Sequence, residues 1–148
     1  MSTTVLFGTP QERRTQLTLT DDYTITNSDF VKDINIATDA KTITLPLITT
    51  QILGVDILIR NTGVDANNIV TISPNALDGI NGSLPASLGA NADATTADGL
   101  ISKAGGVVNK NFVNTKATAN IGDFVVLRAV ALTKWFIVGG VGVWASEA

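Results

Sequence analysis

Carboxylates near the start of the chain are the residues whose type and spacing come closest to a catalytic pattern. Asp21, Asp22, Asp29 and Asp33 are close in sequence. A pair of carboxylates is the minimal requirement for glycoside hydrolysis. Clefts that bind polysaccharides generally need aromatic platforms, however, and this chain has only two Trp and one Tyr. We therefore expect no catalytic residues and predict that the chain is not an enzyme.

A second polar cluster lies in the segment IVTISPNALDGINGS, residues 69–83. The same residue types serve as calcium ligands, sugar-binding groups and turn formers. A calcium loop needs several carboxylates and a bidentate Glu, whereas Asp78 is nearly alone. Pro74-Asn75, Asp78-Gly79 and Asn81-Gly82 suit turns, because Asn and Asp bond to their own backbone and Gly accepts positive φ. We predict turns here, with no metal site and no cofactor.

The composition narrows the function classes further. The chain has no Cys and no His, which excludes disulfides, thiol nucleophiles, imidazole bases and most zinc or copper sites. A net charge of -3 offers no basic face for nucleic acid. Hydrophobic residues make up 45% and charged residues 16%, a balance that favours a folded domain.

Most of the chain alternates between apolar and polar residues with a period of two. In KTITLP, Ile43 and Leu45 fall on one face and the threonines on the other. The same rhythm occurs in GVDILIRNTG and NNIVTIS, which are separated by turn-forming residues. We interpret Asp65 to Asn68 as a hairpin tip, and Asp33, Asn35 and Asp39 as a solvated strand edge.

The most apolar stretch runs from Phe124 to Ala145. Arg128 and Lys134 interrupt it, so no uninterrupted apolar run in it is long enough to span a membrane. Its Val, Ile, Phe and Trp favour strands. We predict a hairpin with strands at Phe124 to Leu132 and Trp135 to Val143, and no contact with a membrane.

These patterns predict an all-β fold, a single β-sandwich or barrel-like domain of short antiparallel strands. Residues 1–20 are expected to form an N-terminal arm and residues 21–148 the β domain. A region rich in Ala, Asn, Gly and Thr, at about residues 83–121, is expected to form one long irregular excursion with scattered short strands or a helical turn.

Three segments in order resemble a family of β-rich modules in virion proteins of tailed bacteriophages. They are DDYTITNSDFVKDINIATDAKTITLP, LGVDILIRNTGVDANNIVTISPNALDGING and GDFVVLRAVALTKWFIVGG. The matching elements are Tyr23 to Asp29, Ile43 to Pro46, Gly54 to Gly63, Val70 to Gly82 and Gly122 to Trp135. This chain departs from the pattern by its Ala/Asn-rich excursion and by its tail from Val141 to Ala148.

The resemblance implies a structural protein of the virion, made in a host cytoplasm. We expect a capsid decoration, cement or head-fibre protein that binds the major capsid protein or other virion proteins. A homo-oligomer, most simply a trimer, would suit a capsid three-fold site. The alternative is a receptor- or glycan-binding module of a tail fibre.

Candidate partner-binding residues lie in two places. In the arm, Val5, Leu6 and Phe7 form a short apolar anchor, and Arg13 and Arg14 carry the densest positive charge of the chain. The arm is expected either to add an edge strand to its own sheet, with the arginines facing water, or to add a strand to a neighbour and pair with its carboxylates. In the excursion, Asn111 and Phe112 are the candidates for contact with a receptor or glycan.

Overall fold

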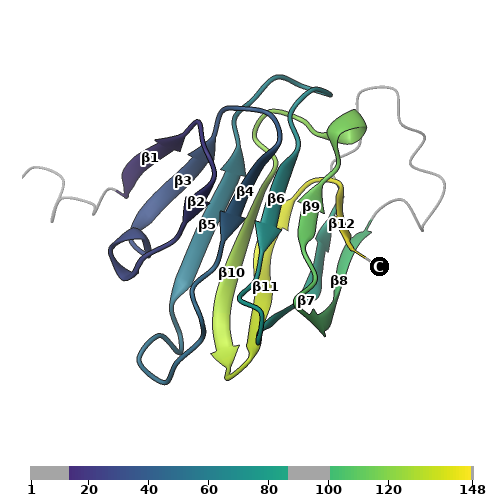
Figure 1. The fold of residues 1–148 in the computed structure, drawn as a ribbon. Coiled ribbons are helices and arrows are strands. Elements are labelled where there is room, and N and C mark those ends of the chain that lie inside the picture. The colour runs from purple at the N-terminus through teal and green to yellow at the C-terminus, as the bar shows by residue number, and fades with distance from the viewer. Residues whose placement is uncertain (1–13, 87–100, 148) are drawn as a thin grey trace, which may run out of the picture.

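A computed structural model describes residues 14–86 and 101–147, which form two packed β-sheets (Figure 1). The seven-stranded sheet has the order β1-β3-β5-β10-β11-β7-β8, and the five-stranded sheet has the order β12-β9-β6-β4-β2. The strands are β1 (Thr15–Leu19), β2 (Tyr23–Thr24), β3 (Lys32–Ile36), β4 (Lys41–Thr44), β5 (Asp56–Asn61), β6 (Val70–Ser73), β7 (Gly79–Pro85), β8 (Ile101–Val108), β9 (Phe112–Asn114), β10 (Phe124–Ala131), β11 (Lys134–Val141) and β12 (Trp144–Ser146). Two short 3-10 helices, η1 (Asn27–Asp29) and η3 (Lys116–Thr118), join them. The predicted all-β, sandwich-like fold is confirmed.

The first six strands wind as a coil with two layers. β1, β3 and β5 belong to the larger sheet and β2, β4 and β6 to the smaller one, so the chain changes layer after each strand. Within each layer these strands are parallel. Ile34 of β3 pairs with Ile59 of β5, and Ile43 of β4 pairs with Ile72 of β6. Each turn of the coil therefore stacks buried aliphatic side chains on those of the turn before.

The prediction of antiparallel strands is wrong for this coil. Alternation shows that one face of a strand is buried, but it does not tell a parallel neighbour from an antiparallel one. Parallel pairs need a long return connection, and here the strand in the opposite sheet forms part of that return. Antiparallel pairs occur between β10 and its neighbours β5 and β11, between β7 and β8, and between β9 and its neighbours β6 and β12.

The hairpin predicted in the most apolar stretch of the sequence is confirmed. β10 and β11 pair antiparallel, with Ala131 opposite Lys134 at the turn. Thr133 in that turn has a φ of 68°, the left-handed conformation that tight hairpin turns require. Within the described residues, no helix is long and apolar enough to cross a membrane.

Two predicted boundaries differ in the structure. β1 pairs in parallel with β3, so residues 15–19 belong to the sheet rather than to an arm that ends at residue 20. The expected excursion at about 83–121 contains the end of β7, all of β8 and β9, and η3.

Glycines allow the close pairing of β7 with β8, because a Cβ on Gly79 would lie 2.6 Å from the carbonyl oxygen of Gly106.

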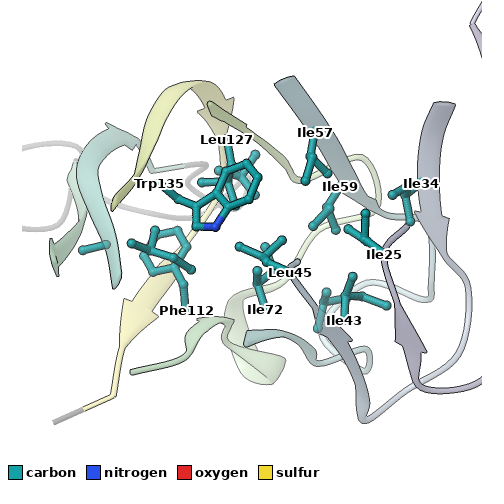
Figure 2. Close-up of a cluster of buried hydrophobic side chains, with 14 of the residues drawn as sticks. Ile25, Ile34, Ile43, Leu45, Ile57, Ile59, Ile72, Phe112, Leu127 and Trp135 are labelled. Atoms are coloured by element: carbon teal, nitrogen blue, oxygen red, sulfur yellow. The ribbon is translucent and has the colours of Figure 1, made fainter. Parts of the chain in front are cut away.

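The core lies between the two sheets, as Figure 2 shows. Its largest fully buried side chains are Trp135 of β11 and Phe112 of β9. The Phe112 ring stacks on Trp144 of β12, with ring centroids 5.4 Å apart and planes inclined by 15°. The hydrophobic effect acting on this interior, filled mainly by Ile, Leu and Val, stabilises the contact between the layers.

A buried asparagine network, formed by Asn61, Asn68, Asn114 and Asp123, joins the sheets at one end. Asn61 Nδ2 donates to Asn114 Oδ1 at 2.7 Å and to the Asn68 carbonyl oxygen at 2.9 Å. Asn61 Oδ1 accepts from Asn68 Nδ2 at 2.6 Å and from the Gly63 amide at 3.0 Å. Asn114 Nδ2 donates to Asp123 Oδ2 at 3.1 Å. Residues 65–68 connect β5 in the larger sheet to β6 in the smaller one, so their interpretation as a hairpin tip is wrong, and Asn68 is only 2% exposed.

Ser102 connects the two sheets along one side of the sandwich. Its hydroxyl donates to the Gly142 carbonyl oxygen at 2.8 Å and accepts from the Trp144 amide at 2.8 Å. Because Ser102 belongs to β8 and Trp144 to β12, this one side chain joins the edge strands of the two sheets. The sandwich is therefore held together at this edge in a barrel-like manner.

Candidate functional site

Of the four carboxylates considered for glycoside hydrolysis, Asp29 and Asp33 are held in separate structural contacts, whereas Asp21 and Asp22 are exposed and Asp22 accepts from the Thr42 amide at 2.8 Å. Asp29 is buried at the end of η1 and accepts hydrogen bonds, each of 2.9 Å, from the Tyr23 hydroxyl, the Thr26 amide and the Lys32 ammonium. Burial alone would raise the pKa of Asp29, but these hydrogen bonds outweigh it and lower the pKa to about 2. The ionised Asp29 therefore fixes the loop that leads into β3.

Asp33 lies on the face of the larger sheet that points away from the core. Arg14 donates to one of its oxygens at 2.5 Å and Gln16 to the other at 3.1 Å. Burial would raise the pKa of Asp33, but the hydrogen bonds from Gln16 and Arg14 lower it overall. Asn35 on the same face is 8% exposed and donates to Gln16 Oε1 at 2.6 Å. The prediction of a solvated edge is wrong for Asn35, and Asp33 is held in this network.

Asp78, predicted as a turn residue, does follow a turn, but its carboxylate is fully buried. Asp78 Oδ2 accepts from the Ile48 amide at 2.9 Å, and the Asp78 carbonyl oxygen accepts from the Asn109 amide at 2.9 Å. Its amide donates to the Asn75 carbonyl oxygen at 2.8 Å. One residue thus ties together the loops that follow β4, β6 and β8. The described residues contain no group of acidic side chains that could hold a metal ion.

Asp78→Asn is expected to stabilise the fold by about 1 kcal/mol at pH 7. Burial raises the pKa of Asp78, and the hydrogen bond from Ile48 offsets this only in part. A raised pKa in the folded state means that stability is highest when the carboxyl is protonated and falls as the pH rises above the unfolded value of 3.8. Asn keeps the acceptor for Ile48 and removes the charge, while its Nδ2 takes the place of Asp78 Oδ1, which has no hydrogen-bond partner among the described residues.

Urea unfolding of both proteins at pH 7 and pH 3.5 measures this effect. The stability difference between Asp78→Asn and the parent protein should be largest at pH 7 and should nearly vanish at the lower pH. An advantage of the same size at both values would show that the charge of Asp78 does not cost stability.

Exposed aliphatic side chains gather at the end of the sandwich that holds Asp78. Of the twelve large hydrophobic side chains that are exposed in the described residues, eight belong to the loops and strand ends there. We call this surface the apolar end, and it comprises Val31, Leu47, Leu53, Leu77, Val107, Val108, Val130 and Leu132. In Figure 1 it is the lower end, where β10 turns into β11 and where the loop between β4 and β5 protrudes.

Backbone hydrogen bonds hold the segments of the apolar end to one another. The Gly54 amide donates to the Ala129 carbonyl oxygen at 2.7 Å, which joins the loop before β5 to the hairpin. The Gly79 amide donates to the Thr133 carbonyl oxygen at 2.9 Å, which joins β7 to the same hairpin. Together with the contacts of Asp78, these bonds hold the segments of the apolar end in fixed positions relative to one another.

Charge is sparse at the apolar end and mostly paired. Residues 45–55 contain no charged side chain. Arg128 and Asp56 form a two-fold hydrogen-bonded ion pair with N–O distances of 2.7 and 2.9 Å. Lys134 starts β11 and is exposed, and within the described part of the chain it forms no ion pair. A surface with many exposed aliphatic side chains and little charge is of the kind that marks interaction sites.

The predicted arm residues are only partly described. Val5, Leu6, Phe7 and Arg13 lie outside the described residues. Arg14 is described, and its guanidinium pairs with Asp33 and donates to the Lys32 carbonyl oxygen at 2.7 Å. In this structure Arg14 therefore binds its own sheet.

The residues expected to contact a receptor or glycan are also held by the fold. Phe112 is fully buried, so the prediction of an exposed ring is wrong. Asn111 is half-buried, and its Nδ2 donates to Glu147 Oε1 at 3.1 Å. Phe112 and Asn114 are buried in β9 and Val113 between them is half-buried, but the sequence FVN does not alternate between apolar and polar residues and so gave no signal that the ring faces inward.

Comparisons of the chain with protein-family models, with curated proteins and with solved structures found no match.

The apolar end was not predicted from the sequence, although a signal for it was present. Loops are usually polar, whereas PLITTQILG carries aliphatic residues between β4 and β5, and Leu132 lies in the turn between β10 and β11. Only the topology shows that these two segments meet.

Proposed function

We propose that this chain is a structural protein of a tailed-bacteriophage virion, of the capsid decoration, cement or head-fibre type, whose apolar end is buried against protein in the assembled particle. The apolar end is the observation that carries the proposal, because exposed apolar patches of this kind mark interaction sites. The sequence segments that resemble virion modules support the same class of protein.

The arrangement suits a passive binding role. The segments of the apolar end are tied by hydrogen bonds to Asp78 and to the hairpin, so little chain ordering is needed on binding. Burial of its aliphatic side chains would supply the favourable free energy. No described contact favours the tail-fibre alternative, since Phe112 lies in the core and Asn111 is bonded to Glu147.

The proposal is tested with a variant that makes the apolar end polar. Leu53→Gln, Leu77→Gln and Leu132→Gln are combined, because all three side chains are exposed and their loss should not unfold the domain. Binding to virions or shells that lack this chain should weaken by about a hundredfold, as expected if roughly 3 kcal/mol of apolar burial is removed. The copies bound per particle are counted by quantitative mass spectrometry.

The matched control is Val138→Gln, which changes an exposed aliphatic residue in β11 away from the apolar end. It should bind as the parent protein does. Full binding by the triple variant, with a melting temperature close to that of the parent, would rule out the apolar end as the attachment surface.

A further inference from the structure

The opposite end of the sandwich carries a smaller apolar patch beside acidic residues. Val64 and Ile121 are 70% and 62% exposed, and they are two of the four large exposed hydrophobic residues that lie outside the apolar end in the described chain. The two loops are joined, because Asp65 accepts a hydrogen bond from the Ile121 amide and the Ala66 amide donates to the Ala119 carbonyl oxygen at 2.7 Å. We call Val64, Asp65 and Ile121 the acidic patch.

The charges of the two ends are complementary. Asp65 is exposed in the acidic patch, and Asp21 and Asp22 are exposed in the loop between β1 and β2 at the same end of the strands. Lys116 at this end is paired with Asp39, and Lys41 at the start of β4 is half-buried. The apolar end presents the exposed Lys134 and the half-buried Lys110, while its acidic residues are Glu147, which is bonded to Asn111, and the buried Asp78. Electrostatic complementarity of this kind fixes the orientation of partners and disfavours like-charged contacts.

We infer that the partner of the apolar end is a second copy of this chain, whose acidic patch docks on it with Asp65 facing Lys134. The inference rests on the proposed function in assigning a protein to the apolar end. Because the two contacting surfaces differ, the contact is heterologous and repeats from copy to copy. Because the two surfaces lie at opposite ends of the sandwich, the contact continues from copy to copy as a fibre and does not close into the expected trimer.

Charge reversal tests the inference. Lys134→Glu and Asp65→Lys each place like charges across the contact, so each should raise the dissociation constant for self-association by at least about tenfold. The double variant, Lys134→Glu with Asp65→Lys, restores opposite charges and should return to within about threefold of the parent protein. Sedimentation equilibrium between about 1 μM and 500 μM measures all four proteins.

Two controls isolate the contact from general effects. Lys103→Glu makes the same change in net charge as Lys134→Glu, but at an exposed position in β8 between the two ends, and it should not alter self-association. Asp65→Asn keeps an oxygen that accepts from the Ile121 amide, and so separates the charge of Asp65 from its role in the loop. Far-ultraviolet circular dichroism establishes that each variant is folded.

The inference is overturned if the parent protein is monomeric over the whole range, if Lys103→Glu acts like Lys134→Glu, or if the double variant is no better than the single ones. Binding of a monomeric parent protein to vesicles of phosphatidylcholine and phosphatidylserine would assign the apolar end to a membrane instead. A monomer that still loses particle binding in the triple Gln variant would overturn this inference and leave the proposed function standing.

Discussion

Asn61→Ala is expected to lower the free energy of unfolding by about 4 kcal/mol, because it leaves several buried groups without partners at once. Asn61 uses both hydrogens of Nδ2 and accepts two hydrogen bonds at Oδ1. Removing it deprives Asn114 Oδ1, Asn68 Nδ2 and the Gly63 amide of a hydrogen-bond partner in an interior from which water is excluded. Each such loss costs about 1–3 kcal/mol.

Urea unfolding followed by circular dichroism measures the change. Asn67→Ala is the matched control, because Asn67 is an exposed asparagine in the same loop as Asn68 and its replacement should cost less than about 0.5 kcal/mol. Equal stability of the two variants would mean that the asparagine network does not hold the sheets together.

Phe112→Ala is expected to destabilise the protein by about 4 kcal/mol, the usual cost of removing a fully buried aromatic ring. The ring is 0% exposed and stacks on Trp144, so its loss leaves a cavity in the core between the two sheets and removes an aromatic contact. The comparison is Phe136→Ala, at a half-buried position on the outer side of β11, which should cost clearly less.

The same pair of variants separates the core role of Phe112 from a role in ligand contact. Thermal and urea unfolding should both show the loss in Phe112→Ala. A variant that retains the stability of the parent protein would contradict the buried position and would revive the interpretation of Phe112 as a surface residue.

The all-β class and the hairpin of β10 and β11 could be predicted because they depend on local pattern. Alternation in KTITLP and VDILIR shows which residues face a core, and the Thr133-Lys134 dipeptide marks a turn. The coiled winding of β1 to β6 could not be predicted, since Ile43 has the same alternation whether its neighbour Ile72 runs parallel or antiparallel. Pairing partners are a property of the whole fold.

The burial and the hydrogen-bond partners of the polar residues were the features that the sequence predicted least well. Asp78, Asn68 and Asn61 are all of types that favour turns, and all three are buried with specific partners. Composition cannot tell a solvated Asn from one that bonds across two sheets, because the difference lies in residues far away in sequence, such as Asn114 for Asn61. The apolar end was hidden for the same reason, as its residues come from loops that meet only in the folded chain.

Cryo-electron microscopy of the virion would show directly whether the apolar end is covered. We expect the sandwich to be found on the particle, with the loop that contains Leu53 and the hairpin that contains Leu132 covered by protein, whether a second copy of the chain or another virion component. A map in which this end of the sandwich faces solvent, or particles that do not contain the chain, would contradict this expectation.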